Sequence, residues 1–140
     1  MKKQNFKNHP RYVFGFHVIT FGVIIAALIV SIILLVSAGI HLSTVFAFLT
    51  AVSLGLLFFY TRQFATGNQD RIIRAEENAR SYRITGKGLD NKLTKAQVIA
   101  LRFADDSEYA ELTQKTLSRN LSVKDIKQLV MQWRADHHRI

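Results

Sequence analysis

The sequence contains no cysteine, and a long part of it contains no charged residue. The absence of cysteine excludes disulfide bonds, thiolate catalysis and zinc ribbons. The absence of charge is local, because no Lys, Arg, Asp or Glu occurs from residue 12 to residue 61. A soluble core in a chain of 140 residues needs no uncharged stretch of that length. The composition therefore excludes a single water-soluble globule, and it equally excludes a wholly disordered chain.

The sequence motifs of common enzyme classes are also missing. The chain carries no Walker loop, no GxSxG, no HExxH and no dinucleotide-binding fingerprint. The uncharged stretch holds no ionisable Asp, Glu, Lys or Arg, which removes the usual signature of a proton relay or an ion pathway. The adjacent His137 and His138 lack an apparent third metal ligand. We therefore expect a protein that is not an enzyme and has no cofactor and no metal site.

The uncharged stretch is long enough for two membrane-spanning helices. Residues 13–36 would form a helix of roughly 36 Å, which exceeds the roughly 30 Å hydrocarbon core of a bilayer. Residues 37–43 include small and turn-forming residues, and a second apolar run then reaches Tyr60. A cleaved signal peptide is the alternative, but its apolar region would be shorter and no second span would follow at once. We expect a transmembrane hairpin over residues 13–61, with spans at about 13–36 and 43–61.

The basic residues around this hairpin indicate its orientation. The net charge is +9, and Lys and Arg flank the outer ends of both predicted spans but are absent from the turn between them. These flanking residues are Lys2, Lys3, Lys7 and Arg11 before the first span, and Arg62, Arg71, Arg74 and Arg80 after the second. The positive-inside rule then places both termini in the cytoplasm, and aromatic residues at the same ends suit the interface. We expect a two-pass protein of the bacterial inner membrane.

Small residues on the predicted spans suggest how the two helices pack. The second span carries four of them at a spacing of four, which places them on one helix face: Ser43, Ala47, Ala51 and Gly55. The first span offers Gly22 and Ala26. We expect the two spans to pack on each other through these residues. The alternative is that the same ridge binds a second copy of the chain or another membrane protein.

The charged remainder predicts further helices, so the fold class is all-α. A basic tail occupies residues 1–12, and residues 62–88 read as a basic amphipathic helix that continues the second span and ends at a glycine turn. Acid precedes base at the favourable i,i+4 spacing in two pairs of this helix, Asp70–Arg74 and Glu76–Arg80.

Residues 89–140 predict a module of three short helices. Each helix follows an N-terminal capping signal, and these signals begin at Thr94, Asp105 and Ser122. The last helix is expected to run from Ile126 through Arg139, with Trp133 on its apolar stripe. So short a module buries little by itself, and we expect it to lean on the long helix, the bilayer or a partner.

The chain resembles a family of small, uncharacterised, two-span bacterial membrane proteins over nearly its whole length. The resemblance is most specific at Ala100-Leu101-Arg102-Phe103-Ala104, at Trp133 and at residues 67–71, and it extends over NFKNHPRY, TRQFATGNQDRIIRAEENAR, TKAQVIALRFADDSEYAEL and LSVKDIKQLVMQWRAD. The family has no assigned activity. The resemblance therefore implies a location and an architecture, and it carries over no catalytic residue.

These observations favour an accessory or scaffold protein of the membrane, which presents its helical module to a protein partner. The residues expected at partner contacts are Asn68, Gln69, Asp70 and Arg71 at the membrane exit, and Arg102 and Trp133 in the module.

An alternative function is a membrane-surface module that binds anionic lipid, and less readily nucleic acid. Its contacts would be the basic residues Arg71, Arg74, Arg80, Arg83 and Lys87. A third class is a small transporter or a membrane-enzyme subunit, which would need several copies to enclose a polar pathway.

Overall fold

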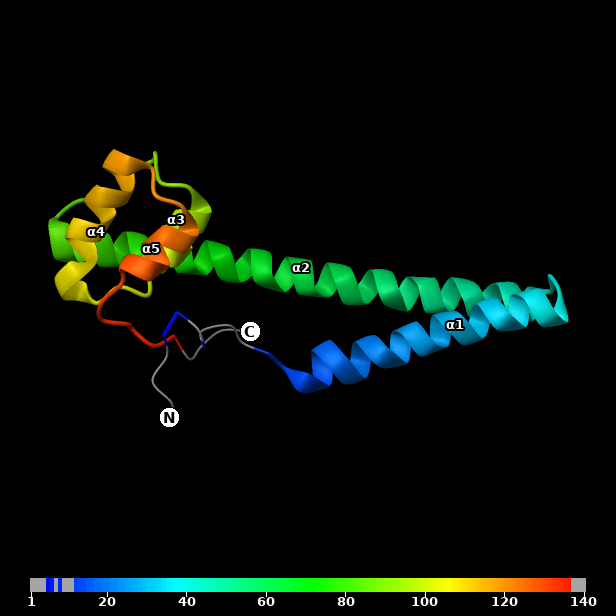
Figure 1. Cartoon of the computed structure of the whole chain (residues 1–140). Coiled ribbons are helices and arrows are strands. Elements are labelled where there is room, and N and C mark those ends of the chain that lie inside the picture. Colours follow the sequence, from blue (N-terminus) through cyan, green and yellow to red (C-terminus); the bar gives the residue numbers. More distant parts are fainter. Residues whose placement is uncertain (1–4, 7, 9–11, 137–140) are drawn as a thin grey trace. The chain divides into compact units, whose positions relative to one another are not determined.

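The computed structural model describes residues 5, 6, 8 and 12–136, and within them every named element is a helix (Figure 1). The predicted all-α class is confirmed. These residues form two compact units, one within residues 11–65 and the other mainly from residues 66–136. The basic side chains expected at Lys2, Lys3, Lys7 and Arg11 lie outside the described residues, as do His137 and His138.

The first unit is a helical hairpin. A π-helical turn, η1 (Gly15–Thr20), leads into α1 (Phe21–Ala38), and α2 (Leu42–Thr85) returns along it. Gly39 adopts a φ of 84°, which a residue with a side chain rarely adopts. The Thr44 hydroxyl closes the turn, since it donates to the Gly39 carbonyl at 2.8 Å and accepts from the His41 N–H at 3.0 Å.

The small residues of α2 meet α1 at two of the four expected positions. Ala51 is 4% exposed, and a Cβ on Gly55 would lie 3.8 Å from the Ile24 side chain, so Ile24 fills the space that the glycine leaves. Ala47 is partly buried and Ser43 is exposed.

The expected contribution of Gly22 and Ala26 to this packing is wrong. Both are exposed, and a Cβ on Gly22 would meet no atom within 4 Å. The face of α1 that meets α2 instead carries the half-buried Ile24 and the buried Ser31, which are seven residues apart and therefore on one side of the helix. Gly22 and Ala26 lie on the other side, because each is two residues from Ile24.

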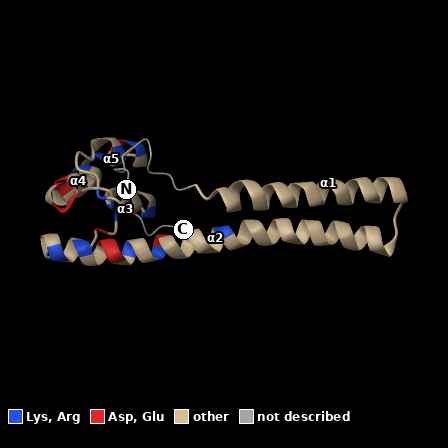
Figure 2. Ribbon diagram, turned by 90° about the horizontal axis from the view of Figure 1, so that it is seen from below, with Lys and Arg blue, Asp and Glu red and all other residues tan. Residues whose placement is uncertain are grey.

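Both long helices expose nearly all of their apolar surface. Residues 15–38 and α2 are each long and apolar enough to cross a membrane. Only 6% of the most apolar window of residues 15–38 is buried, and only 11% of the most apolar window of α2. The charged residues of α2 all lie from Arg62 onward, and α1 has none (Figure 2). The core helices of a soluble protein are, by contrast, mostly buried.

The second unit is the helical module, which comprises the described residues from Thr66 to Asp136. The end of α2 packs with α3 (Lys95–Leu101), α4 (Asp106–Arg119) and α5 (Val123–Leu129). Thr94, Asp105 and Ser122 cap the three short helices through their side chains, which confirms the predicted capping residues. The largest fully buried side chains of its core are Tyr109, Phe103, Leu101, Ile126, Val98 and Thr116.

The last helix is shorter than expected. α5 ends at Leu129, and residues 130–136 form an irregular segment, here called the C-terminal strap. Trp133 forms an antiparallel bridge with Ala104, and Arg134 N–H donates to the Phe103 carbonyl at 2.8 Å. The predicted helix through Trp133 is therefore wrong, because pairing with the loop before α4 replaces the helical hydrogen bonds of this segment.

Candidate functional site

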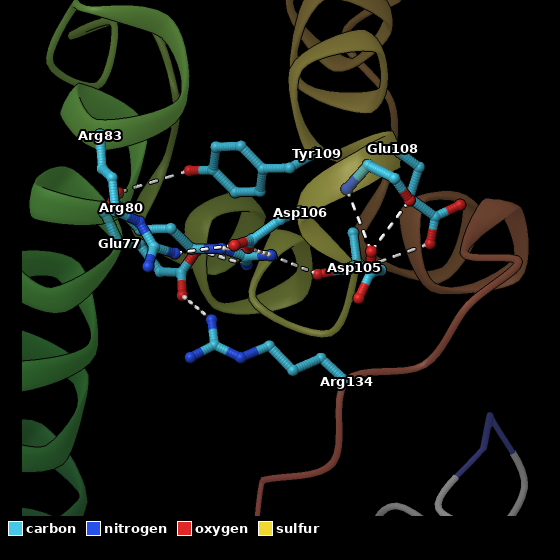
Figure 3. Close-up of polar contacts among 10 residues, drawn as sticks. Glu77, Arg80, Arg83, Asp105, Asp106, Glu108, Tyr109 and Arg134 are labelled. Carbon is cyan, nitrogen blue, oxygen red and sulfur yellow. Dashed lines mark hydrogen bonds and ion pairs between the residues drawn. The ribbon is translucent and has the colours of Figure 1, made fainter.

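The module contains an ion cluster, defined here as the buried Glu77 and Arg80 with the exposed Asp106, and Arg83 and Arg134 lie at its edge (Figure 3). Glu77 and Arg80 come from α2, three residues apart on its inner face, and each is 5% exposed. Asp106 is the first residue of α4. The cluster therefore joins the long helix to the N-terminus of α4, where a negative charge is favourable.

Arg80 is the centre of the cluster. Its Nε donates to Asp106 Oδ1 at 2.7 Å, its Nη1 to Glu77 Oε2 at 3.2 Å and its Nη2 to the Ala104 carbonyl at 2.6 Å. The guanidinium also lies over the Tyr109 ring, 4.4 Å from its centroid. Three hydrogen bonds and one aromatic contact hold this buried guanidinium in place. Its role is therefore structural, and it is not available to bind lipid.

Burial and neighbouring charges shift the acid–base behaviour of the cluster. Burial raises the pKa of Glu77 above its ordinary value, against the opposing effect of the Arg80 guanidinium and, at 3.8 Å, Arg134. Burial, together with the nearby Glu77 carboxylate, raises the pKa of Tyr109 to about 12. At neutral pH Tyr109 is therefore protonated, and its ring serves as a face for Arg80.

Glu108 holds the C-terminal strap. Its Oε1 accepts from the Gln132 N–H at 3.1 Å and its Oε2 from the Met131 N–H at 3.0 Å. Oε1 also faces the Asp105 N–H at 3.4 Å and completes the capping box of α4. The Asp105 side chain in turn accepts from the Ser107 N–H and hydroxyl, which lowers the pKa of Asp105. One carboxylate thus both starts α4 and fixes the strap.

Replacing Glu108 by alanine should release the strap. We expect a loss of about 1–3 kcal/mol in the unfolding free energy of the module, because a helix cap and two charge-assisted hydrogen bonds disappear. Hydrogen exchange at the Met131 and Gln132 amides should accelerate far more than exchange at Ile126. Glu111→Ala, at an exposed position of the same helix, is the control and should change stability by less than about 0.5 kcal/mol. Equal exchange in the two variants would contradict the role of Glu108.

The residues predicted at the membrane exit do not converge on one site. Asn68 is exposed, Gln69 is half-buried, and Asp70 pairs with Lys95 of α3 at 3.1 Å. The i,i+4 spacing predicts that Asp70 pairs with Arg74, but Asp70 pairs with Lys95 of α3. The same spacing predicts that Arg80 pairs with Glu76, but Arg80 pairs with Glu77.

Among the basic residues of the lipid hypothesis, Arg71, Arg74 and Lys87 are exposed. Arg83 is exposed as well, but it pairs with Asp106 at 2.7 Å. Arg80 is buried, so the structure does not place it on a surface that lipid could reach.

Arg102 and Trp133 do lie near each other, because both pack against Phe103. The Trp133 ring packs 5.0 Å from the Phe103 ring, and the Arg102 guanidinium lies 4.7 Å from the same ring. Arg102 is 8% exposed and pairs with Asp136 of the strap at 3.0 Å. Both residues predicted to contact a partner are therefore used to bind the strap to the module.

Sequence analysis missed the residues that organise the cluster, Glu77, Asp106 and Tyr109, and the residue that holds the strap, Glu108. A capping box signal was present, because Glu108 follows Asp105 by three residues. No local signal identifies the partner of Arg80 in α4, since Asp106 is far from it in sequence. Among the described residues, no three His, Asp or Glu side chains gather to hold a metal ion.

Comparison with known proteins places the whole chain in a protein family. The model of a family of unknown function, DUF6526, matches residues 1–140. No curated protein matches the chain, and no solved structure does. The resemblance to an uncharacterised family is confirmed at that level, whereas the membrane character and bacterial origin ascribed to the family stay predictions.

Proposed function

We propose that this chain, which belongs to the DUF6526 family of unknown function, is a non-enzymatic membrane scaffold that presents a cytoplasmic helical module to a protein partner. The observation that supports the proposal most strongly is the exposure of the two apolar helices, because only 6% and 11% of their most apolar windows are buried. A helix of that composition is stable when hydrocarbon covers it. The scaffold is anchored by α1 and the first half of α2.

The aromatic side chains of the hairpin support this placement. Phe16 stacks on Phe58 with ring centroids 4.3 Å apart, and the Arg62 guanidinium lies 5.6 Å from the centroid of Phe16. Tyr60 and Phe64 stack at the same end of the hairpin. Aromatic rings and a guanidinium suit the boundary between hydrocarbon and headgroups. We propose that this end faces the cytoplasm of a bacterium and that the turn at Gly39 faces the other side.

The module's buried charges support a structural role over catalysis. Glu77, Arg80 and Arg102 are each committed to ion pairs within the fold. Binding of anionic lipid stays a second candidate through Arg71, Arg74 and Lys87, the basic residues on the surface. This lipid-binding surface has fewer basic residues than the sequence predicts, because Arg80 is buried.

The topology can be tested by cysteine labelling, because the chain has no cysteine of its own. Ile40→Cys places a thiol at a turn position that is 82% exposed, and Ser118→Cys places one on the exposed surface of α4. In intact spheroplasts, a membrane-impermeant maleimide should label I40C fully and S118C only after lysis.

Carbonate extraction provides the second measurement. The chain should stay in the pellet, as an integral membrane protein does. Release into the supernatant would overturn the membrane assignment, and labelling of S118C in intact spheroplasts would overturn the orientation alone. For the second candidate, salt-insensitive binding of the reconstituted chain to anionic vesicles would argue against lipid recognition.

A further inference from the structure

The part of α2 within the module has an apolar outer face that the module does not use. Ile72 is 58% exposed and Tyr82 is 63% exposed, and Ala75 and Ala79 between them are exposed as well. These four residues follow one another at spacings of three, four and three. That spacing is the a and d pattern of two coiled-coil heptads, which brings all four to one side of the helix.

The opposite side of the same segment is the one that packs on α3 to α5. Its buried residues are Ile73, Glu77, Arg80 and Ser81, each at most 6% exposed. They include the ion cluster and therefore fix the rotation of α2 within the module. The outer face is consequently presented away from the module's core, with an aliphatic, two small and one aromatic side chain.

Charges beside the outer face identify a partner. In this heptad register, Ile72 and Ala79 occupy the positions named a. Arg71, directly before Ile72, then occupies a position named g, and Glu76, directly after Ala75, occupies a position named e. In a parallel pair of helices, a g residue of one copy faces the e residue five positions later in the other. Arg71 of one copy would therefore face Glu76 of its partner, twice by symmetry. The next such pair, Asn78 with Arg83, brings no like charges together.

We propose that this outer face binds the same face of a second copy of the chain in a parallel helix pair. The proposal rests on the proposed membrane anchor, because two copies inserted in the same orientation present α2 in the same direction. Ala75 and Ala79 allow the backbones to approach closely, and Ile72 and Tyr82 cover the ends of the contact. Two heptads bury less than the roughly 1,200 Å² of a standard stable interface. The shared membrane supplies the missing stability by raising the effective concentration of the two copies.

Disulfide cross-linking of the full chain in reconstituted membranes tests the pairing. Ala75→Cys and Ala79→Cys place thiols at d and a positions, and Arg74→Cys provides a matched, exposed control on another side of the same helix. Under mild oxidation, A75C and A79C should each give a disulfide-linked dimer as the main product. R74C should give at least fivefold less.

The charge pair can be tested in the A79C background. Arg71→Glu should lower the dimer yield severalfold, because two glutamates then face each other, and adding Glu76→Arg should restore it. Equal yields from A79C and R74C, or a yield unchanged by R71E, would overturn the proposal. Carbonate extraction of the same membranes separates the two proposals. An integrated chain without cross-links refutes the pairing only, whereas a chain that is not integrated refutes the anchor and with it the parallel pairing.

Discussion

Replacing Arg80 by alanine is expected to lower the unfolding free energy of the module by about 3–5 kcal/mol, the usual cost of removing one partner of a buried ion pair. Among the residues that the structure describes, the substitution leaves the Glu77 carboxylate, 5% exposed, with only Arg134 within ion-pair distance, at 3.8 Å. It also removes the hydrogen bond to the Ala104 carbonyl and the cation from the Tyr109 ring. Trp133 is the only tryptophan of the chain and lies in the module. Its fluorescence during urea unfolding of the full chain in detergent is therefore the measurement.

Two further variants separate this effect from a general loss of charge. Arg83→Ala removes a cation that also bonds to Asp106, but the Arg83 side chain is 67% exposed and the change should cost less than about 1 kcal/mol. Adding Glu77→Gln to Arg80→Ala should recover much of the loss, because no buried charge is then left unpaired. Equal destabilisation by R80A and R83A would show that burial of the cluster does not decide its energetics.

The same experiment has a pH dependence with a definite sign. The pKa of Glu77 is raised in the folded module, so the folded state binds this proton more readily than the unfolded state does. The contribution of Glu77 to the stability of the module is therefore greatest at low pH. It declines as the pH rises from 4.5, the ordinary pKa of a glutamate, through the raised pKa of Glu77 in the folded module. Removing Arg80 raises that pKa further. The loss caused by R80A should therefore be smaller at pH 5 than at pH 8.

Replacing Phe103 by alanine is expected to cost about 3–5 kcal/mol, the usual range for deleting a fully buried phenylalanine ring. Phe103 is 0% exposed, and its ring meets Trp133 at 5.0 Å, the Arg102 guanidinium at 4.7 Å and the Lys127 ammonium at 5.6 Å. The ring therefore connects the end of α3, α5 and the strap. Its loss should also move Trp133 toward water and shift the tryptophan emission to longer wavelength before any urea is added.

Phe103→Leu is the matched control, because it keeps most of the apolar volume and should cost less than about 1.5 kcal/mol. Tryptophan emission of this variant should stay near that of the unmodified chain. If F103A unfolded at the same urea concentration as F103L, the ring would not be the element that holds the strap.

Much of the fold could be predicted because its signals are local. Thr94, Asp105 and Ser122 cap helices through hydrogen bonds to residues two or three positions away, so a short window of sequence contains the whole interaction. The apolar spans and the turn at Gly39 depend likewise on neighbouring residues. The end of α5 could not be found in this way, because the apolar spacing that includes Trp133 suits a helix and a strap equally well.

The candidate site was harder to predict for the same reason. Helix spacing favoured Arg80 with Glu76, yet Arg80 bonds to Glu77, Asp106 and the Ala104 carbonyl. An i,i+4 pair on a solvated helix is worth only about 0.2–0.5 kcal/mol, so contacts made in a desolvated core easily override it. Gly22 was similarly misjudged, because helix spacing does not reveal which side of α1 meets α2.

The sequence by itself determined that the chain is all-helical, that two of its helices are long and apolar enough to cross a membrane, and where each short helix of the module begins. These properties follow from composition and from interactions within a few residues. Only the tertiary structure decided that Arg80 is buried in an ion cluster, that Trp133 lies on Phe103 in a strap, and that the outer face of α2 is left uncovered. Each of these depends on which distant residues share a desolvated space, and a linear pattern does not contain that information.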